Sequence, residues 1–123
     1  MDANGETIGV IGATTQLIEQ ISSPAGTVDS TGGQNDMAAL AAVLQPVIND
    51  LTTNFGVNKI VLVSHLQQIA LEEELAGLLS GVDVIIAGGS DTILANPDDT
   101  LEAGDVAGDS YPIVTSDLDG NPT

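Results

Sequence analysis

Three short segments carry side chains that could bind a metal ion or a polar ligand. Ser64-His65 ends one apolar run, and Ser90-Asp91 follows another after two glycines. A third apolar run ends at residues 12–15 with two threonines. Ligands of open α/β sheets bind beyond the carboxyl ends of the strands. We therefore expect His65, the only histidine of the chain, and Asp91 to face one another at one sheet edge.

Each of these features also has a purely structural interpretation. A single histidine is often an ordinary packed or solvated residue, and Asp91 could simply cap the turn after its strand. Gly9-Val10-Ile11-Gly12 has two glycines of a phosphate-binding loop, but it lacks the third. No well-capped helix begins directly behind it, so close strand packing is the better interpretation.

Apolar runs and helical periodicity predict the elements that position these residues. Continuous apolar runs predict buried strands at 7–13, 58–64 and 82–86. Between them, apolar residues at helical spacing predict amphipathic helices over 36–56 and 66–79. Strands that alternate with helices indicate an α/β fold, a mostly parallel sheet flanked by helices.

Several residues set the expected bounds of the helices. Asp36 is a good N-cap, Gly56 ends the first helix, and Pro46 should kink or break it. In the second helix, the three glutamates 72–74 are expected on the solvent side, with Gly81 at its C-terminus.

The two ends of the chain suggest a part of a larger domain. Asn4-Gly5 is a hairpin-turn dipeptide with too few residues before it to form the partner strand. A short strand is expected at 111–115, and the turn at 117–121 has no strand behind it. Residues 16–30 and the acidic segment 93–110 lack apolar periodicity and are expected to be loops. Unpaired sheet edges of such a chain predict self-association.

The charge balance excludes several classes of partner. Eighteen acidic residues face one basic residue, Lys59, which gives a formal net charge of −17. Such a chain cannot neutralise the phosphates of a nucleic acid, so we exclude nucleic-acid binding. An anionic substrate would need a metal ion or backbone amides to hold it. The acidity also suits a protein that works at high salt, or a surface that binds calcium weakly.

Targeting and redox signals are absent from the sequence itself. There are no cysteines, so neither a disulfide framework nor a thiolate metal site is expected. No apolar run reaches the length of a membrane span, and residues 1–4 do not resemble a signal peptide.

Four segments in one order resemble a known family. They are residues 8–15 (IGVIGATT), 62–66 (LVSHL), 81–86 (GVDVII) and Tyr111-Pro112. Together they resemble the calcineurin-like metallophosphoesterases, in particular the 5′-nucleotidase branch and its alkaline-phosphatase relatives. The resemblance implies a part of a four-layer α/β/β/α-type catalytic domain, spanning residues 1–123 with the acidic loop at 93–110. It also implies an extracellular or periplasmic parent that hydrolyses nucleotides or other phosphate monoesters.

The resemblance further implies a two-metal centre to which this chain contributes only part of the ligands. His65 matches the histidine of the family's S-H-L motif and would ligate one metal ion. Ser64 and Ser90 would lie at the edge of the substrate site. The family's D-x-H, G-D and G-N-H-[ED] motifs, which carry most of the ligands, would precede residue 1. We therefore expect the chain to be the C-terminal part of the domain and to be inactive alone.

The sequence departs from the family pattern after the third strand. Where the family has I-I-G-G-H-S-H-T, this chain has IIAGGSDT at 85–92. One family histidine is replaced by Gly89, which has no side-chain ligand, and the other by Asp91. A carboxylate in place of imidazole favours magnesium, manganese or calcium over zinc. The loss of one of the two metal ions is also possible.

A second hypothesis needs no catalysis. The chain could be an acidic cation-binding or self-assembling module that keeps the fold without the chemistry. The acidic residues at 98–109 could bind calcium, but their spacing fits no calcium loop, so a solvated charged loop is the better interpretation. Asp117-Leu118-Asp119-Gly120-Asn121 is similar to the start of an EF-hand, but its glycine comes too early, so a hairpin turn is expected.

Overall fold

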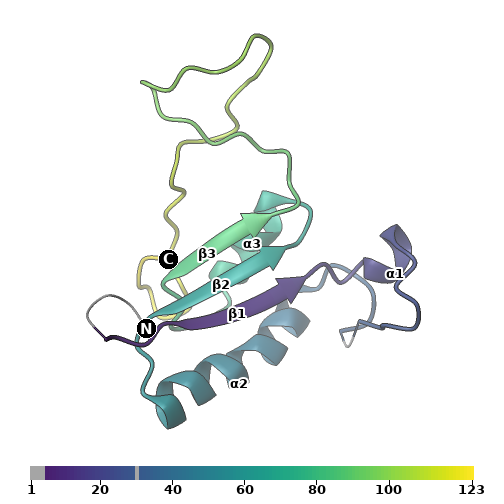
Figure 1. The fold of residues 1–123 in the computed structure, drawn as a ribbon, viewed down its shortest axis with the longest axis vertical. Helices are drawn as coiled ribbons and strands as arrows, with labels where there is room; N and C mark the ends of the chain where they lie inside the picture. The colour runs from purple at the N-terminus through teal and green to yellow at the C-terminus, as the bar shows by residue number, and fades with distance from the viewer. Residues whose placement is uncertain (1–4, 30) are drawn as a thin grey trace.

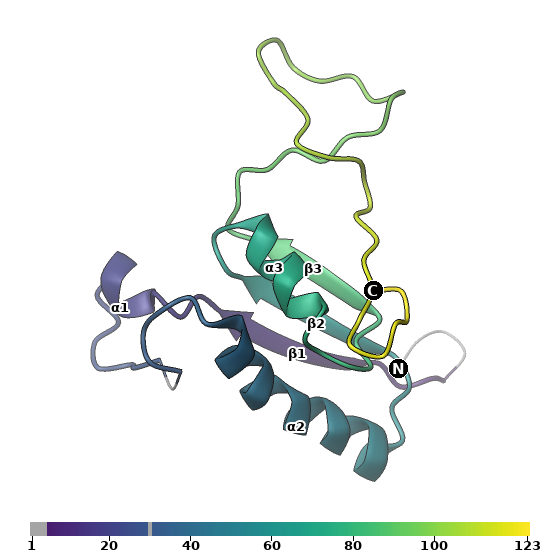
Figure 2. The ribbon, with the colours of Figure 1, turned by 180° about the vertical axis from the view of Figure 1, so that it is seen from behind.

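The computed structural model describes residues 5–29 and 31–123. Three strands, β1 (Gly9–Thr14), β2 (Ile60–His65) and β3 (Val84–Gly88), form a parallel sheet in the order β1-β2-β3 (Figure 1). Helices α2 (Met37–Phe55) and α3 (Ile69–Ala76) both lie on one face of this sheet (Figure 2). The predicted α/β class is confirmed. Asn4 of the predicted N-terminal turn lies outside the described residues.

Only one face of the sheet carries the core. Side chains alternate between the faces of a strand, so every second residue meets the helices. On that face Ile11, Ile60 and Leu62 are buried in one cluster with residues from both helices. The opposite face presents valines and isoleucines to solvent, including Val10 at 66% and Ile86 at 54% exposure. Parallel sheets normally bury both faces, so this open apolar face is unusual.

Helix α2 begins and ends where the sequence predicts but is not broken at Pro46. The Asp36 carboxylate accepts a hydrogen bond from Ala39 N at 2.9 Å, and Gly56 ends the helix with φ of 65°. The helix continues through Pro46, which is exposed. A proline removes one backbone donor. The buried stripe that includes Leu44 and Ile48 holds the helix on the sheet despite that loss.

Helix α3 and its surroundings differ from the prediction. The helix ends at Ala76, so Gly81 is not at its C-terminus but in the turn before β3, with φ of 80°. Glu73 and Glu74 are exposed as predicted, whereas Glu72 is buried at 3% exposure. A one-turn helix, α1 (Ile18–Ile21), lies in the segment predicted as irregular. In the described part of the chain, no helix is long and apolar enough to cross a membrane.

The C-terminal segment forms a turn but not the predicted strand. Residues 111–114 have no strand pairing. Thr115 exchanges two backbone hydrogen bonds with Thr123, both of 3.0 Å, which form an isolated bridge between Ser116 and Pro122. Asp117 organises the turn, since its carboxylate accepts hydrogen bonds from the N–H groups of Asp119 and Asn121 at 2.9 and 2.7 Å. It also accepts one from Gly81 N at 3.3 Å, which ties the turn to the α3–β3 connection.

Candidate functional site

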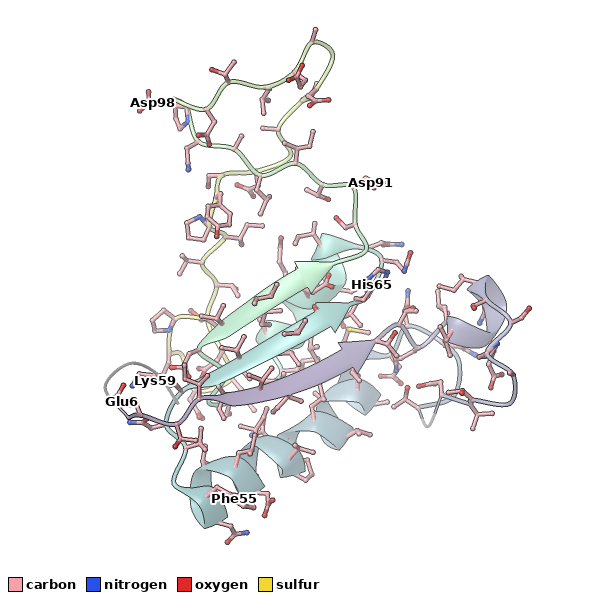
Figure 3. The ribbon with its side chains drawn as sticks, in the orientation of Figure 1. Glu6, Phe55, Lys59, His65, Asp91 and Asp98 are labelled. Atoms are coloured by element: carbon pink, nitrogen blue, oxygen red, sulfur yellow. The ribbon has the colours of Figure 1, made fainter. Side chains whose placement is uncertain are left out.

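The candidate site lies at the carboxyl edge of the sheet. Strand register places Thr14, His65 and Gly88 in one row across β1, β2 and β3. His65 is exposed on the open face of the sheet, and Asp91 lies on the chain that leaves β3 (Figure 3). Both residues are therefore near the strand ends, as the parallel topology requires.

The His65 ring packs against the backbone of Gly89. A Cβ atom built on Gly89 would lie 2.7 Å from both Nε2 and Cδ2 of His65, which is closer than real Cβ atoms approach other atoms. Gly89 also has a φ of 86°, a conformation that favours glycine. Glycine at position 89 is thus explained by the ring that lies over it. A histidine at this position would have to displace His65.

Neither candidate ligand is engaged by other groups in the described part of the chain. No hydrogen bond or ion pair there involves the His65 imidazole or the Asp91 carboxylate. The turn after β3 is instead capped by Ser90, whose Oγ accepts a hydrogen bond from Thr92 N at 3.0 Å. The interpretation of Asp91 as the cap of this turn is therefore not supported.

The donor types suit a divalent cation, but their number is small. An exposed imidazole and an exposed carboxylate are ordinary ligands of zinc, manganese or magnesium. Within residues 5–29 and 31–123, no group of three or more histidines, cysteines or acids is close enough to hold a metal ion. His65 and Asp91 thus provide at most part of a coordination shell.

The two serines predicted at the substrate edge occupy different environments. Ser64 is buried on the helix face of the sheet, opposite to His65, because adjacent residues of a strand point to opposite faces. Its Oγ donates to Glu72 Oε1 at 3.0 Å. Ser90 is half-buried beside the strand end. The structure therefore brings Ser90, but not the Ser64 side chain, toward the open edge.

Glu72 is a buried carboxylate that the sequence prediction placed in solvent. Its Oε1 also accepts a hydrogen bond from Leu66 N at 3.2 Å, whereas its Oε2 is buried without a hydrogen-bond partner among the described residues. Helical spacing could have revealed this position. Glu72 precedes the buried Leu75 and Leu79 by three and seven residues, so it lies on their stripe.

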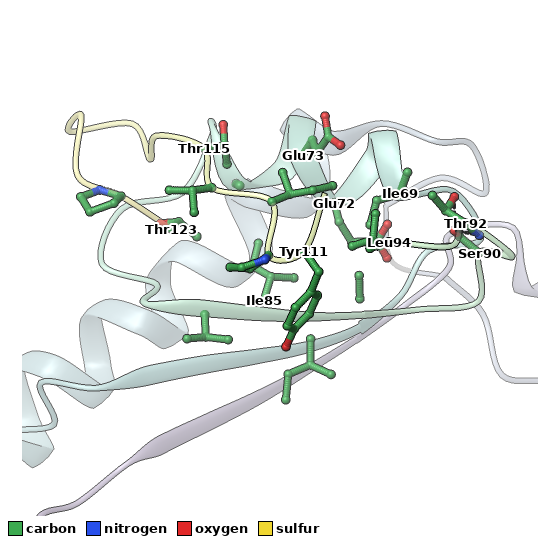
Figure 4. Close-up of a pocket in the computed structure, with 18 of the residues that line it drawn as sticks. Ile69, Glu72, Glu73, Ile85, Ser90, Thr92, Leu94, Tyr111, Thr115 and Thr123 are labelled. Atoms are coloured by element: carbon green, nitrogen blue, oxygen red, sulfur yellow. Dashed lines mark hydrogen bonds between the residues drawn. The ribbon is translucent and has the colours of Figure 1, made fainter. Parts of the chain in front are cut away.

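A groove of about 630 Å³ runs beside β3, between α3 and residues 111–115 (Figure 4). Most of its wall is apolar, with Ile85 from β3 and Tyr111 from the C-terminal segment. The acidic residues Glu72, Glu73 and Asp83 also line it. The groove was not predicted, because it depends on where the irregular C-terminal segment lies.

The candidate site thus has the His65 imidazole at the end of β2, the Asp91 carboxylate on the chain that leaves β3, and an acidic groove beside β3. Comparison with known proteins finds no matching protein family and no matching curated protein.

Proposed function

We propose that this chain contributes a metal ligand, His65, to a metal-dependent phosphomonoester hydrolase of the calcineurin-like metallophosphoesterase type. One observation carries the proposal. The histidine of the S-H-L motif is exposed at the carboxyl end of β2, with no hydrogen bond to any described residue. Two of the other resembling segments lie on β1 and β3, the strands that flank it. The fourth, Tyr111-Pro112, lies in the irregular C-terminal segment. Nucleotides or other phosphate monoesters are the proposed substrates.

His65 would hold the ion through its neutral imidazole, and Asp91 would add a hard oxygen ligand. Metal ions in such centres orient the phosphate ester and lower the pKa of a bound water. This chain needs a cation to attract a phosphate, because its one basic residue, Lys59, is already paired with Glu6. Two ligands do not complete a two-metal centre, so we expect the 123-residue chain alone to be inactive.

Calorimetric titration with zinc or manganese tests the ligand assignment without requiring activity. The wild-type chain is expected to bind the ion, His65→Ala to lose binding, and Asp91→Asn to bind more weakly. Asp98→Asn is the matched control, because Asp98 is an exposed acid in the distant loop (Figure 3). Equal binding by all four proteins would contradict the assignment.

A chromogenic phosphomonoester assay with added divalent metals tests the activity of the chain. We expect no turnover above the metal-only blank. Robust turnover that disappears in His65→Ala would confirm phosphoesterase chemistry but contradict the proposal that the centre is incomplete.

A second function, a non-catalytic module that binds calcium or self-associates, is favoured by the acidic loop. Its acids are all exposed: Asp98, Asp99, Glu102, Asp105 and Asp109. Gly89 beneath His65 also removes one ligand that the hydrolase pattern expects. This function predicts calcium binding that persists in His65→Ala, so the same titrations separate the two proposals.

A further inference from the structure

We propose that the groove beside β3 binds an extended peptide that carries basic residues, which adds to the sheet as a fourth strand. Strand addition to an exposed edge is a common mode of peptide recognition, in which backbone hydrogen bonds supply affinity and alternate side chains supply specificity. The proposal uses the free edge of β3 and the acids of the groove, and it does not depend on a metal at His65.

The first support is the unpaired backbone edge of β3. Gly9 N donates to Lys59 O, so alternate residues of β2 point their peptide groups to β1, and Ile60, Leu62 and Ser64 point theirs to β3. In the parallel register these groups pair with Val84, Ile86 and Gly88. Ile85 and Ala87, which alternate with them, direct their N–H and C=O groups toward the groove. No described backbone group pairs with them, since residues 111–114 across the groove make no backbone hydrogen bond to β3. Such an edge is a template for another strand.

The second support is the size of the groove. Five residues of β3 span about 16 Å at roughly 3.3 Å per residue, which is the length of a five-residue peptide strand. The volume of about 630 Å³ lies in the range of pockets that enclose a ligand.

The third support is charge, and it selects the occupant. Three acidic residues line the groove, and no lysine, arginine or histidine is among the described residues that line it. One of them, Asp83, also accepts a hydrogen bond from Ile60 N at 2.7 Å. The buried Oε2 of Glu72 lacks a hydrogen-bond partner in the described part of the chain, so a donor entering from the groove could satisfy it. A second copy of this chain, with a net charge of −17, would be repelled. A peptide with lysine or arginine is therefore the complementary partner.

Side-chain alternation predicts the peptide pattern. Residues that point toward α3 would meet Glu72 and Glu73, and these should be basic. Residues that point to the other face would extend the open apolar surface next to Val84 and Ile86, and these should be apolar. A capped peptide of alternating valine and lysine, five residues long, is the matching probe.

Amide-resolved NMR titration with this peptide, combined with hydrogen exchange, tests the proposal. We expect saturable binding and slower exchange of the Ile85 and Ala87 amides. A fully N-methylated peptide, which cannot donate backbone hydrogen bonds, and a peptide with glutamate in place of lysine should not bind. Absence of binding by the lysine peptide, or equal binding by the N-methylated one, would overturn the proposal.

Protein variants test the charge argument. Glu73→Gln should weaken binding about two- to fivefold, as expected for loss of one exposed ion pair. Glu74→Gln is the matched control, because Glu74 is exposed on the same helix but does not line the groove, and it should bind like wild type. His65→Ala should also bind like wild type, which separates this result from the metal proposal. Equal affinity of the Glu73 variant, or dimers in sedimentation that protect the same two amides, would contradict the basic-peptide assignment.

Discussion

Replacing Gly89 with alanine tests the packing of the candidate site. Two costs are expected. The φ of 86° at Gly89 is unfavourable for a residue with a side chain, at about 1–2 kcal/mol. The new methyl group would also lie 2.7 Å from the His65 ring, so the ring must leave its position. A displaced rotamer costs about 0.5–1.5 kcal/mol. We therefore expect Gly89→Ala to lower the free energy of unfolding by about 1.5–3.5 kcal/mol.

Two other glycines separate the two costs. Gly104 has a φ of 103° but open space around its Cα. Gly104→Ala should therefore lower the free energy of unfolding only by the cost of the backbone conformation. Gly12 has open space and no positive φ, so Gly12→Ala should be neutral or slightly stabilising. Urea denaturation followed by circular dichroism measures all three variants.

The coupling between Gly89 and His65 is measured by a double-mutant cycle. In a His65→Ala background the ring is absent, so Gly89→Ala should cost only the backbone part. The reasoning is refuted if Gly89→Ala is as neutral as Gly12→Ala. It is also refuted if its cost is the same with and without the His65 ring, because the contact with the ring would then contribute nothing.

Two further predictions concern buried carboxylates. Burial raises the pKa of Asp117, but hydrogen bonds from the N–H groups of Asn121 and Gly81 outweigh it, so its pKa lies below 3.8. Its stabilising contribution is therefore present above pH 3.8 and lost as pH falls through the lower folded-state pKa. At pH 7, Asp117→Asn should unfold at a lower urea concentration than wild type. This difference in midpoint should shrink in more acidic buffer, and a constant difference would contradict the prediction. Glu72→Ala leaves the Ser64 hydroxyl and Leu66 N–H without their acceptor, at about 1–3 kcal/mol for each group. Glu72→Gln keeps an acceptor, so it should lower the melting temperature less than Glu72→Ala does. Equal decreases in the two variants would show that these hydrogen bonds are not the cause.

Much of the fold could be predicted because strands and helix caps are encoded locally. The three apolar runs became β1, β2 and β3 with bounds shifted by one to two residues, and Asp36 and Gly56 delimit α2 as expected. The position of His65 at a strand end followed from the same runs. Strand alternation could also have shown that Ser64 and His65 point to opposite faces, since adjacent residues always do.

Other features could not be predicted, because they depend on contacts between distant segments. Pro46 favours a broken helix locally, but packing of the buried stripe on the sheet outweighs the lost hydrogen bond. Residues 111–115 are apolar enough for a strand, yet strand formation requires a pairing partner. Among the described residues only Thr115 has one, through its two backbone hydrogen bonds with Thr123.

The sequence by itself determined the α/β class, the order of elements and the exposed end position of His65, because hydrophobic periodicity and caps act over a few residues. Only the tertiary structure decided the burial of Glu72, the packing of His65 on Gly89 and the acidic groove beside β3. Glu72 is buried where α3 meets the end of β2, and His65 packs where β2 meets the turn after β3. The groove forms where α3, β3 and the C-terminal segment meet. Their relative placement is set by burial of apolar surface across the whole domain, which no short stretch of sequence specifies.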